Sequence, residues 1–192
     1  MRAFAGYEKA RIITDTERIP VGGYVVKILN AEEVTFKNGG RGLKLSFDVV
    51  DGDYKDFFKK NYEQQRQEDR KWKGNIMLFV PKEDGSEMDE WTANKFKTNM
   101  SAIEESNSGY HWDWNEQGLK GKVVGAVFRN KEYEDNGSTR FFSECCQLKT
   151  VEAIREGKYK IPKDKLLNKV NTNAPDGNIE GFIPTDDEDL PF

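Results

Sequence analysis

The residues best suited to chemistry lie between positions 54 and 73, where aromatic and cationic side chains are interleaved. The aromatic residues are Tyr54, Phe57, Phe58, Tyr62 and Trp72, and the cationic ones are Lys55, Lys59, Lys60, Arg66, Arg70, Lys71 and Lys73. Aromatic faces stack on bases, and spaced cations follow a phosphate backbone, so this combination is typical of single-strand binding without sequence preference. We predict nucleic-acid contacts for all of these residues except Phe57. The alternative is that the rings fill the core while the lysines are only solvated.

Two further stretches carry the same residue types. Tyr110-His111-Trp112-Asp113-Trp114 places three aromatic residues within five positions, and we predict a contact for Trp112, although the cluster could equally plug one end of the fold. The Asn136-Gly137 turn is flanked by cationic and aromatic residues. Of these, we predict that Arg129, Tyr133 and Arg140 contact a strand from a projecting hairpin.

Signatures of catalysis are absent from the sequence. His111 is the only histidine and has no accompanying nucleophile motif. Gly39-Gly40-Arg41-Gly42 is too short for a phosphate loop and is better interpreted as a hairpin turn. Cys145 and Cys146 are adjacent and match neither a redox pair nor a zinc ligand set. We therefore predict a protein that is not an enzyme and that uses no metal or cofactor.

The chain ends in Asp186-Asp187-Glu188-Asp189-Leu190-Pro191-Phe192. Four acids suit a basic rim on a partner, while Leu190, Pro191 and the terminal Phe192 suit a small apolar pocket that also captures the end carboxylate. These seven residues, which we call the tip, are predicted to bind a partner protein; the alternative is an ordinary acidic terminus.

Charge is distributed unevenly along the 192 residues. The formal net charge is −4, but residues 171–192 hold six acids and no Lys or Arg, which leaves about +2 on residues 1–170. This asymmetry permits a nucleic-acid-binding face on the body. No apolar run is long enough to span a membrane and no apolar signal core follows Met1, so we expect a cytoplasmic protein without membrane contact.

Periodicity predicts the elements that must position these residues. Strands are expected from Gly22 to Leu29 and from Leu43 to Val49, by alternation of apolar and polar residues. Residues 53–74 fit either period, and a strand leading into a polar helix or loop is preferred. Residues 76–80 are an apolar run that could be a strand or a packed connection. A helix is expected to begin at an Asp89 N-cap and to end at Asn107-Ser108-Gly109.

The remainder of the body is predicted to be a hairpin of residues 123–128 and 140–148, followed by one or two helical turns at 151–155. This order gives a mainly β, α+β fold with one principal helix. It matches the five-stranded OB-fold barrel, with its helix between strands three and four. We assign residues 1–163 to this single-strand-binding domain and 164–192 to a flexible acidic tail that consists of a linker and the tip.

Two resemblances add to these expectations. The tip resembles that of bacterial single-stranded DNA-binding proteins. Residues 18–163 resemble a phage and prophage family of Gram-positive bacteria, found among replication and recombination genes. The matching stretches are Ile19 to Ile28, Leu43 to Asp48, Phe96-Lys97, Ile103 to Asn107, Gly109-Tyr110, Leu119 to Gly125 and Val151 to Gly157. The resemblance implies an OB-like phage protein that coats single-stranded DNA, but it transfers no site residues.

The sequence thus favours a DNA-coating protein that recruits replication or recombination proteins through its tip. The runner-up is a phage adaptor or inhibitor that captures a host replication factor with the tip and binds no DNA. A duplex-DNA or RNA binder is a weaker alternative. The oligomeric state stays open, and a homo-oligomer is compatible with the near-neutral body.

Overall fold

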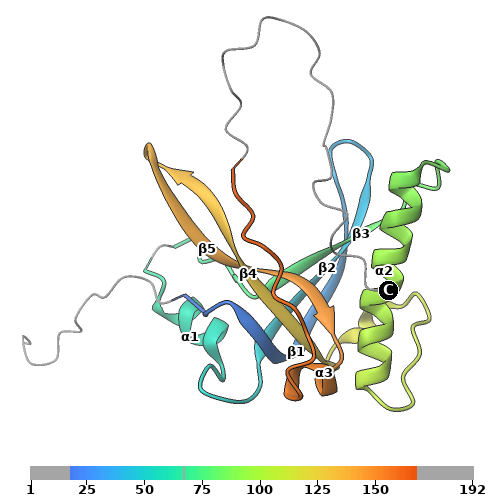
Figure 1. Cartoon of the computed structure of the whole chain (residues 1–192), viewed down its shortest axis with the longest axis horizontal. Coiled ribbons are helices and arrows are strands. Elements are labelled where there is room, and N and C mark those ends of the chain that lie inside the picture. The colour runs from blue at the N-terminus through green and yellow to red at the C-terminus, as the bar shows by residue number, and fades with distance from the viewer. Residues whose placement is uncertain (1–17, 67, 168–192) are drawn as a thin grey trace, which may run out of the picture.

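The computed structural model describes residues 18–66 and 68–167 (Figure 1). Within these ranges the chain forms one antiparallel five-stranded sheet in the order β3-β2-β1-β4-β5. The strands are β1 (Gly22–Thr35), β2 (Arg41–Val49), β3 (Asn75–Val80), β4 (Val123–Asp135) and β5 (Ser138–Lys149). The helices are α1 (Phe57–Gln64), α2 (Glu87–Ser106), α3 (Val151–Arg155) and the short 3-10 helix η2 (Glu116–Leu119). The predicted mainly β, α+β class is therefore confirmed.

The central strand β1 is shared between two hairpins. Its first part, residues 22–27, pairs with β4, and residues 26–35 pair with β2. Register shifts interrupt the ladders between Ile28 and Asn30 and between Val127 and Phe128, and such bulges increase strand bending and twist. The sheet therefore coils around one core instead of lying flat.

Helix α2 covers the opening between the two edges of this sheet. No ladder joins β3 to β5 within the described residues, so the expected barrel is not closed by strand pairing. Instead, α2 packs against β3, β4 and β5, burying Phe96, Met100 and Ile103. The buried Asn99 accepts a hydrogen bond from the backbone N–H of Leu148 at 2.9 Å, which satisfies a donor of β5.

The expected strand near residue 54 is wrong, because residues 57–64 form α1. Phe57, Phe58 and Tyr62 therefore follow the helical period, the second of the two that fit this segment. The buried carboxylate of Asp48 on β2 accepts from the backbone N–H groups of Val49, Phe58 and Lys59 at 2.8–3.0 Å. Because it satisfies donors that the first turn of a helix leaves free, Asp48 ties α1 to the sheet.

The predicted start of the principal helix is also wrong. Its N-cap is Ser86, whose hydroxyl accepts from the backbone N–H of Asp89 at 3.2 Å. Asp89 lies in the first turn and accepts from the backbone N–H of Lys82. The polar first turn gave no apolar period by which to locate the start. The predicted end at Asn107, the β4–β5 hairpin around Asn136-Gly137 and the 151–155 helix are confirmed.

The C-terminal end of the described chain lies against β4. Lys165 forms a parallel bridge with Lys131, and the backbone N–H of Lys165 donates to the carbonyl of Asn130 at 2.9 Å. The first residues assigned to the linker therefore contact the body. The tip and the rest of the linker lie outside the described residues.

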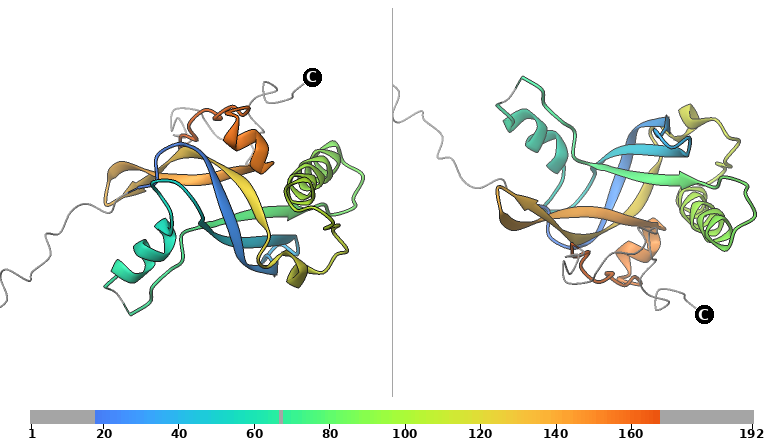
Figure 2. Two further views of the ribbon diagram at one scale, coloured as in Figure 1. Left: turned by 90° about the horizontal axis from the view of Figure 1, so that it is seen from below. Right: turned by 90° about the horizontal axis from the view of Figure 1, so that it is seen from above.

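The two ends of the molecule carry different elements. Both views of Figure 2 place α1 and the free end of the β4–β5 hairpin at one end and α2 at the opposite end. The turn between β1 and β2 lies on the side of α2 (Figure 1). None of the helices in the described part of the chain combines the length and apolar character that a bilayer crossing needs.

Candidate nucleic-acid interface

The aromatic residues predicted to stack in segment 54–73 pack mostly inward. Phe58 is 4% exposed and lies among Phe47, Phe57 and Phe128, with ring centroids 5.2–6.0 Å apart. The predicted base contact of Phe58 is therefore wrong, because its faces are covered by the core. Tyr54 is half-buried and meets Tyr24 edge to face, at a centroid distance of 5.6 Å. The core-filling alternative holds for this part of the segment.

Tyr62, Arg70 and Trp72 form a small cluster at the outer end of α1. The rings of Tyr62 and Trp72 are 5.8 Å apart, and the guanidinium of Arg70 lies 4.8 Å from the centroid of Tyr62. The Nε1–H of Trp72 donates to the carbonyls of Phe47 and Gly74, both at 3.1 Å. Trp72 is thus positioned by the sheet and is half-buried, which leaves it limited room to stack on a base.

The cations of the same segment stay exposed. The exposed members are Lys55, Lys59, Lys60, Arg66, Arg70, Lys71 and Lys73. Lys60 donates to the carbonyl of Lys55 at 2.9 Å, and Lys71 pairs with Asp69 at 3.6 Å, where both side chains are largely in water. Exposed pairs of this kind are weak and readily exchanged. The segment is therefore a cationic surface above a packed aromatic layer.

The predicted residues of the β4–β5 hairpin are largely neutralised by acids on the same hairpin. Arg129 donates twice to one carboxylate oxygen of Glu144, at 3.0 and 3.1 Å, and Lys131 contacts the other oxygen at 3.1 Å. Arg140 pairs with Asp135 at 3.3 Å. Tyr133 is exposed and meets Phe142 edge to face at 5.6 Å. The hairpin offers an aromatic edge but few uncompensated positive charges.

Trp112 lies apart from these residues, beyond the C-terminal end of α2. Its ring packs on the core, and its Nε1–H is buried without a hydrogen-bond partner among the described residues. Trp114 is exposed and stacks on Phe96 at 6.2 Å with an interplanar angle of 7°. The plug interpretation fits Trp112, whereas Trp114 presents one ring face to solvent.

A candidate site that the sequence patterns do not indicate lies on the outer face of β1, β2 and β3. Side chains alternate along these strands, so Leu43, Leu45, Ile76 and Leu78 point into the core. The register places Gly42 beside Val34 on β1 and Phe79 on β3, all on the opposite face. The next outward row of this face joins Glu32, Lys44 and Met77.

Two phenylalanines stand together on this outer face. Phe79 is 59% exposed, and its ring centroid lies 5.6 Å from that of Phe36, which follows β1. Gly42 lies beneath them, because a Cβ at this position would be 2.8 Å from the Sδ of Met77 and 3.1 Å from the Cζ of Phe36. We call Phe36, Gly42, Met77 and Phe79 the platform. Its form is that of a shallow apolar shelf with one ring open to solvent.

Two cations, Lys44 and Lys82, lie beside the platform. Lys37 and Lys82 are exposed, and the side chain of Lys82 reaches the turn at Gly40. Lys44, on the same face as the platform, pairs with Glu32 at 2.9 Å, and both side chains are well exposed. Arg41 pairs with Glu33 at 3.2 Å on the other face of the sheet, because it alternates with Gly42 along β2. A phosphate can replace a carboxylate in such exposed pairs at small cost. The platform therefore combines an open ring with cations on its rim.

Groups suited to covalent or metal chemistry are not gathered at this surface. Cys145 and Cys146 are free; burial raises the pKa of Cys146 to about 11 and holds that of Cys145 well above its ordinary value. Both thiols are therefore protonated at neutral pH. In the part of the chain that the structure describes, no three His, Cys, Asp or Glu side chains are grouped so that they could hold a metal ion.

Comparison with known proteins places the chain in a family without giving it a function. The profile of the family described as "Protein of unknown function (DUF669)" matches residues 6–104, just over half of the chain. The chain therefore belongs to this family. No curated protein matches the chain.

Proposed function

We propose that the protein binds single-stranded DNA on the platform with little sequence preference, without catalysing a reaction. The observation that carries the proposal is the exposed ring of Phe79, 5.6 Å from the half-buried ring of Phe36, with Lys44 on the same face of the sheet and the side chain of Lys82 at the neighbouring turn. Open rings stack on any base, and lysines and arginines contact the phosphates between them.

The strand order supports an OB-like body. In the OB-fold the first strand pairs with both the second and the fourth, and strands three and five close the barrel. The order β3-β2-β1-β4-β5 is this arrangement opened between β3 and β5, with α2 in the gap. OB-folds bind oligonucleotides on the face of strands two and three, flanked by the loops after strands one and four. The platform occupies the corresponding face.

The tip completes the proposal. It supplies a polyanionic, apolar-ended peptide suited to capture by a basic pocket of a replication or recombination protein. Together with the sequence resemblances, this supports a phage or prophage DNA-coating protein acting in the bacterial cytoplasm. Deletion of residues 186–192 should leave DNA affinity unchanged or raised, because it removes negative charge without removing the platform. A large loss of DNA affinity would contradict this division.

The decisive experiment measures binding to oligo(dT) by fluorescence anisotropy, at low and moderate salt, with duplex DNA as the competitor. Phe79→Ala and Phe36→Ala should each raise Kd by about 5- to 150-fold, since stacking one base contributes about 1–3 kcal/mol. The matched variant is Tyr133→Ala, which removes an exposed ring from the hairpin.

The outcomes test the location of the site and the DNA-binding function separately. If Tyr133→Ala weakens binding while the platform variants do not, the strand follows the hairpin and the platform assignment is wrong. If the wild-type protein binds no single strand at low salt, DNA coating is wrong. The adaptor hypothesis, with the tip as its binding element, then takes its place.

A further inference from the structure

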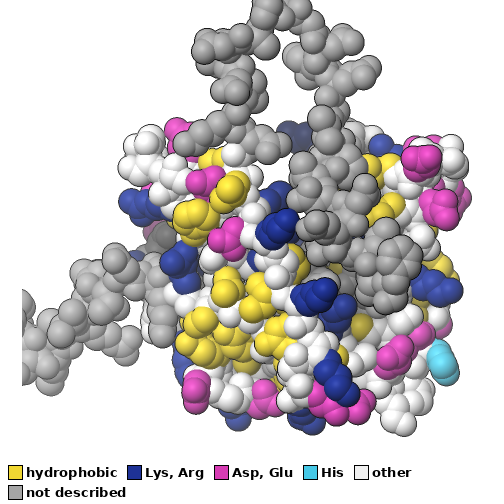
Figure 3. Space-filling model, in the orientation of Figure 1, with side chains coloured by type: hydrophobic (Ala, Val, Ile, Leu, Met, Phe, Trp, Pro, Cys, Tyr) yellow, Lys and Arg dark blue, Asp and Glu magenta, His cyan; other side chains and the backbone are white. Residues whose placement is uncertain are grey.

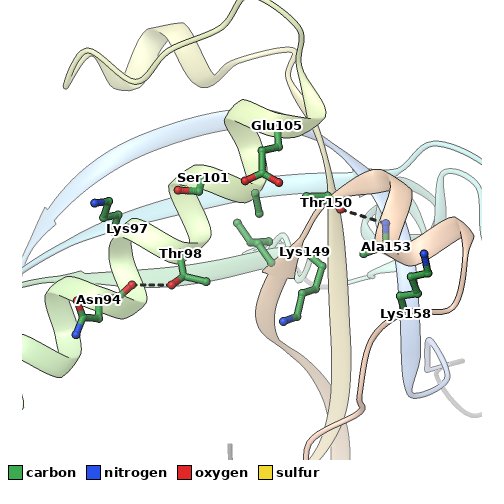
Figure 4. A pocket seen from close by; sticks show the side chains of 11 residues that line it. Asn94, Lys97, Thr98, Ser101, Glu105, Lys149, Thr150, Ala153 and Lys158 are labelled. Atoms are coloured by element: carbon green, nitrogen blue, oxygen red, sulfur yellow. Dashed lines mark hydrogen bonds between the residues drawn. The ribbon is translucent and has the colours of Figure 1, made fainter. Parts of the chain in front are cut away.

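A groove lies between α2 and the junction of β5 with α3, in a region that the platform does not include. It has a volume of about 650 Å³. Asn94, Lys97, Thr98 and Ser101 line it from one face of α2, and Lys149 and Lys158 line it on the side of β5 and α3 (Figure 4). Ala102, Leu148 and Ala153 form its apolar floor. The walls are therefore polar and the hollow is made by small residues.

The groove is held open by close packing of α3 on the sheet. A Cβ at Gly125 of β4 would lie 2.3 Å from the Cγ1 of Ile154, so only glycine lets α3 approach this closely. Thr150 caps α3 by accepting from the backbone N–H of Ala153 at 3.1 Å. Helix α2 and the end of β5 thus fix the walls from which Lys97 and Lys149 project.

The charge of the groove is strongly biased. Three lysines line it, against the single acid Glu105, which lies where the groove adjoins a second hollow near Arg155. Lys158 pairs with Glu156 at 2.8 Å, but Lys97 and Lys149 form no ion pair with any residue of the described ranges. Clefts lined by one sign of charge concentrate counter-ions of the opposite sign.

The chemistry of the walls identifies the counter-ion. Lysine, serine, threonine and asparagine are the side chains with which proteins hold phosphate oxygens. The hydroxyl of Ser101 has no hydrogen-bond partner among the described residues, and Thr98 donates to the carbonyl of Asn94 at 2.8 Å. Neither an aromatic ring nor an arginine occurs among the described residues of the lining. The groove therefore has no ring on which a base could stack and no guanidinium to bind a carboxylate through two hydrogen bonds.

From these observations we infer that the groove is a phosphate-binding site, and that it holds the backbone of the single strand beyond the bases stacked on the platform. The source of the phosphate rests on the proposed function; the phosphate chemistry rests on the groove alone. Several Lys and Arg side chains lie close together near the middle of the molecular face shown in Figure 3. They offer a cationic surface to the phosphate backbone of a single strand.

The test uses the full chain and two charge-matched variants. Lys97→Gln with Lys149→Gln removes the two unpaired groove lysines while keeping side-chain length. Lys27→Gln with Lys120→Gln removes two exposed lysines that do not line the groove. Each variant is titrated with oligo(dT) of about 10 nucleotides, within the roughly 4–16 nucleotides that a single OB-fold covers, and of about 40 nucleotides, well beyond it. Salt dependence is measured for the longer oligonucleotide.

The groove variant should bind the short oligonucleotide within about twofold of wild type and the long one about tenfold more weakly. Its salt slope should fall by about 1.4, because each lost phosphate contact on a single strand removes about 0.7. The control variant should show neither difference. Equal affinity and equal slope for both variants would overturn the placement of the strand in the groove.

A second measurement separates the two sources of phosphate. Amide chemical shifts of Ser101, Thr150 and Ala153 are followed during titration with inorganic phosphate. Saturable shifts that are lost in the groove variant support phosphate binding even if wild type binds no DNA, in which case the proposed function fails and a small phosphate is the ligand. If neither phosphate nor the long oligonucleotide moves these amides, the groove is not a phosphate site.

Discussion

The segment around α1 and the platform both combine aromatic rings with cations. The segment around α1 exposes its cations and buries its rings, whereas the platform exposes a ring. In residues 54–73 the rings of Tyr54, Phe57 and Phe58 pack on the core, and the lysines face water. On the platform Phe79 faces water, while Lys44 beside it is paired with Glu32. Composition therefore finds regions rich in suitable residues, but the direction of each ring decides what the region can bind.

Helices and strands produce this difference by simple geometry. A helix gathers residues three and four apart on one face, so the aromatic stripe of α1 meets the sheet as a unit. A strand sends successive residues to opposite faces, so β3 buries Ile76 and Leu78 and presents Phe79 outward. The same aromatic content thus forms a core in one region and an exposed surface in the other.

The largest expected difference between the regions is in stability. Phe58→Ala should lower the free energy of unfolding by about 3–5 kcal/mol, because it removes a buried ring and leaves a cavity. Phe79→Ala should change stability by less than about 0.5 kcal/mol, because its ring is mostly in water. Denaturant unfolding followed by far-UV circular dichroism measures both. Equal losses in the two variants would break the distinction between a buried and an exposed ring.

Asp48 tests how α1 is tied to the sheet. Asp48→Ala should cost about 2–3 kcal/mol, because it leaves the backbone N–H groups of Val49, Phe58 and Lys59 without their acceptor. Thermal unfolding gives the change. The exposed Asp53→Ala is the control, and a comparable loss in that variant would show that Asp48 has no special role.

Asp48 should also make the stability of the protein depend on pH. Burial raises the pKa of this carboxyl above its ordinary value, although three backbone hydrogen bonds oppose the shift. Between the ordinary and the raised pKa, the folded protein holds a proton that the unfolded chain has released. Stability due to this group is therefore present below the ordinary pKa and falls as the pH rises through the raised pKa. Asp48→Ala should remove this contribution.

Sequence patterns located the elements better than they located the surface. Alternation predicted β1 and β2, and Asn136-Gly137 predicted the last hairpin, because these signals are local. The apolar run 76–80 gave no such guidance for Phe79, since a strand apolar on both sides reads as fully buried. Only the register with Gly42 shows that Phe79 lies over an open shelf.

Local sequence patterns could not predict the contacts between segments that are distant in the chain. Lys97, Lys149 and Lys158 meet because α2, β5 and α3 pack together, and nothing in their spacing indicates it. Asn99 satisfies an edge donor of β5 from a helix about fifty positions earlier. The charge split between body and tail was visible, by contrast, because it needs no folded contact.

Trp72 provides a smaller effect within the α1 region. Trp72→Phe should lower stability by about 1 kcal/mol, because the indole N–H donates to the carbonyls of Phe47 and Gly74. Its effect on oligo(dT) affinity should be below twofold. A loss of affinity as large as that of Phe79→Ala would show that the half-buried indole stacks on a base, and the two regions would then share one function.

The smallest expected effect separates phosphate contact from stacking in the α1 region. Lys59→Gln with Lys60→Gln removes two exposed charges beside a packed aromatic layer. If the strand passes this surface, the salt slope should fall by about 1.4, while DNA should leave the fluorescence of Trp72 unquenched, because no ring there meets a base. Quenching of Trp72 would indicate stacking near α1, and an unchanged slope would confine the strand to the opposite end of the molecule. The cationic surface over α1 would then be a solvated face, and the platform would have to supply the DNA contacts with its own cations.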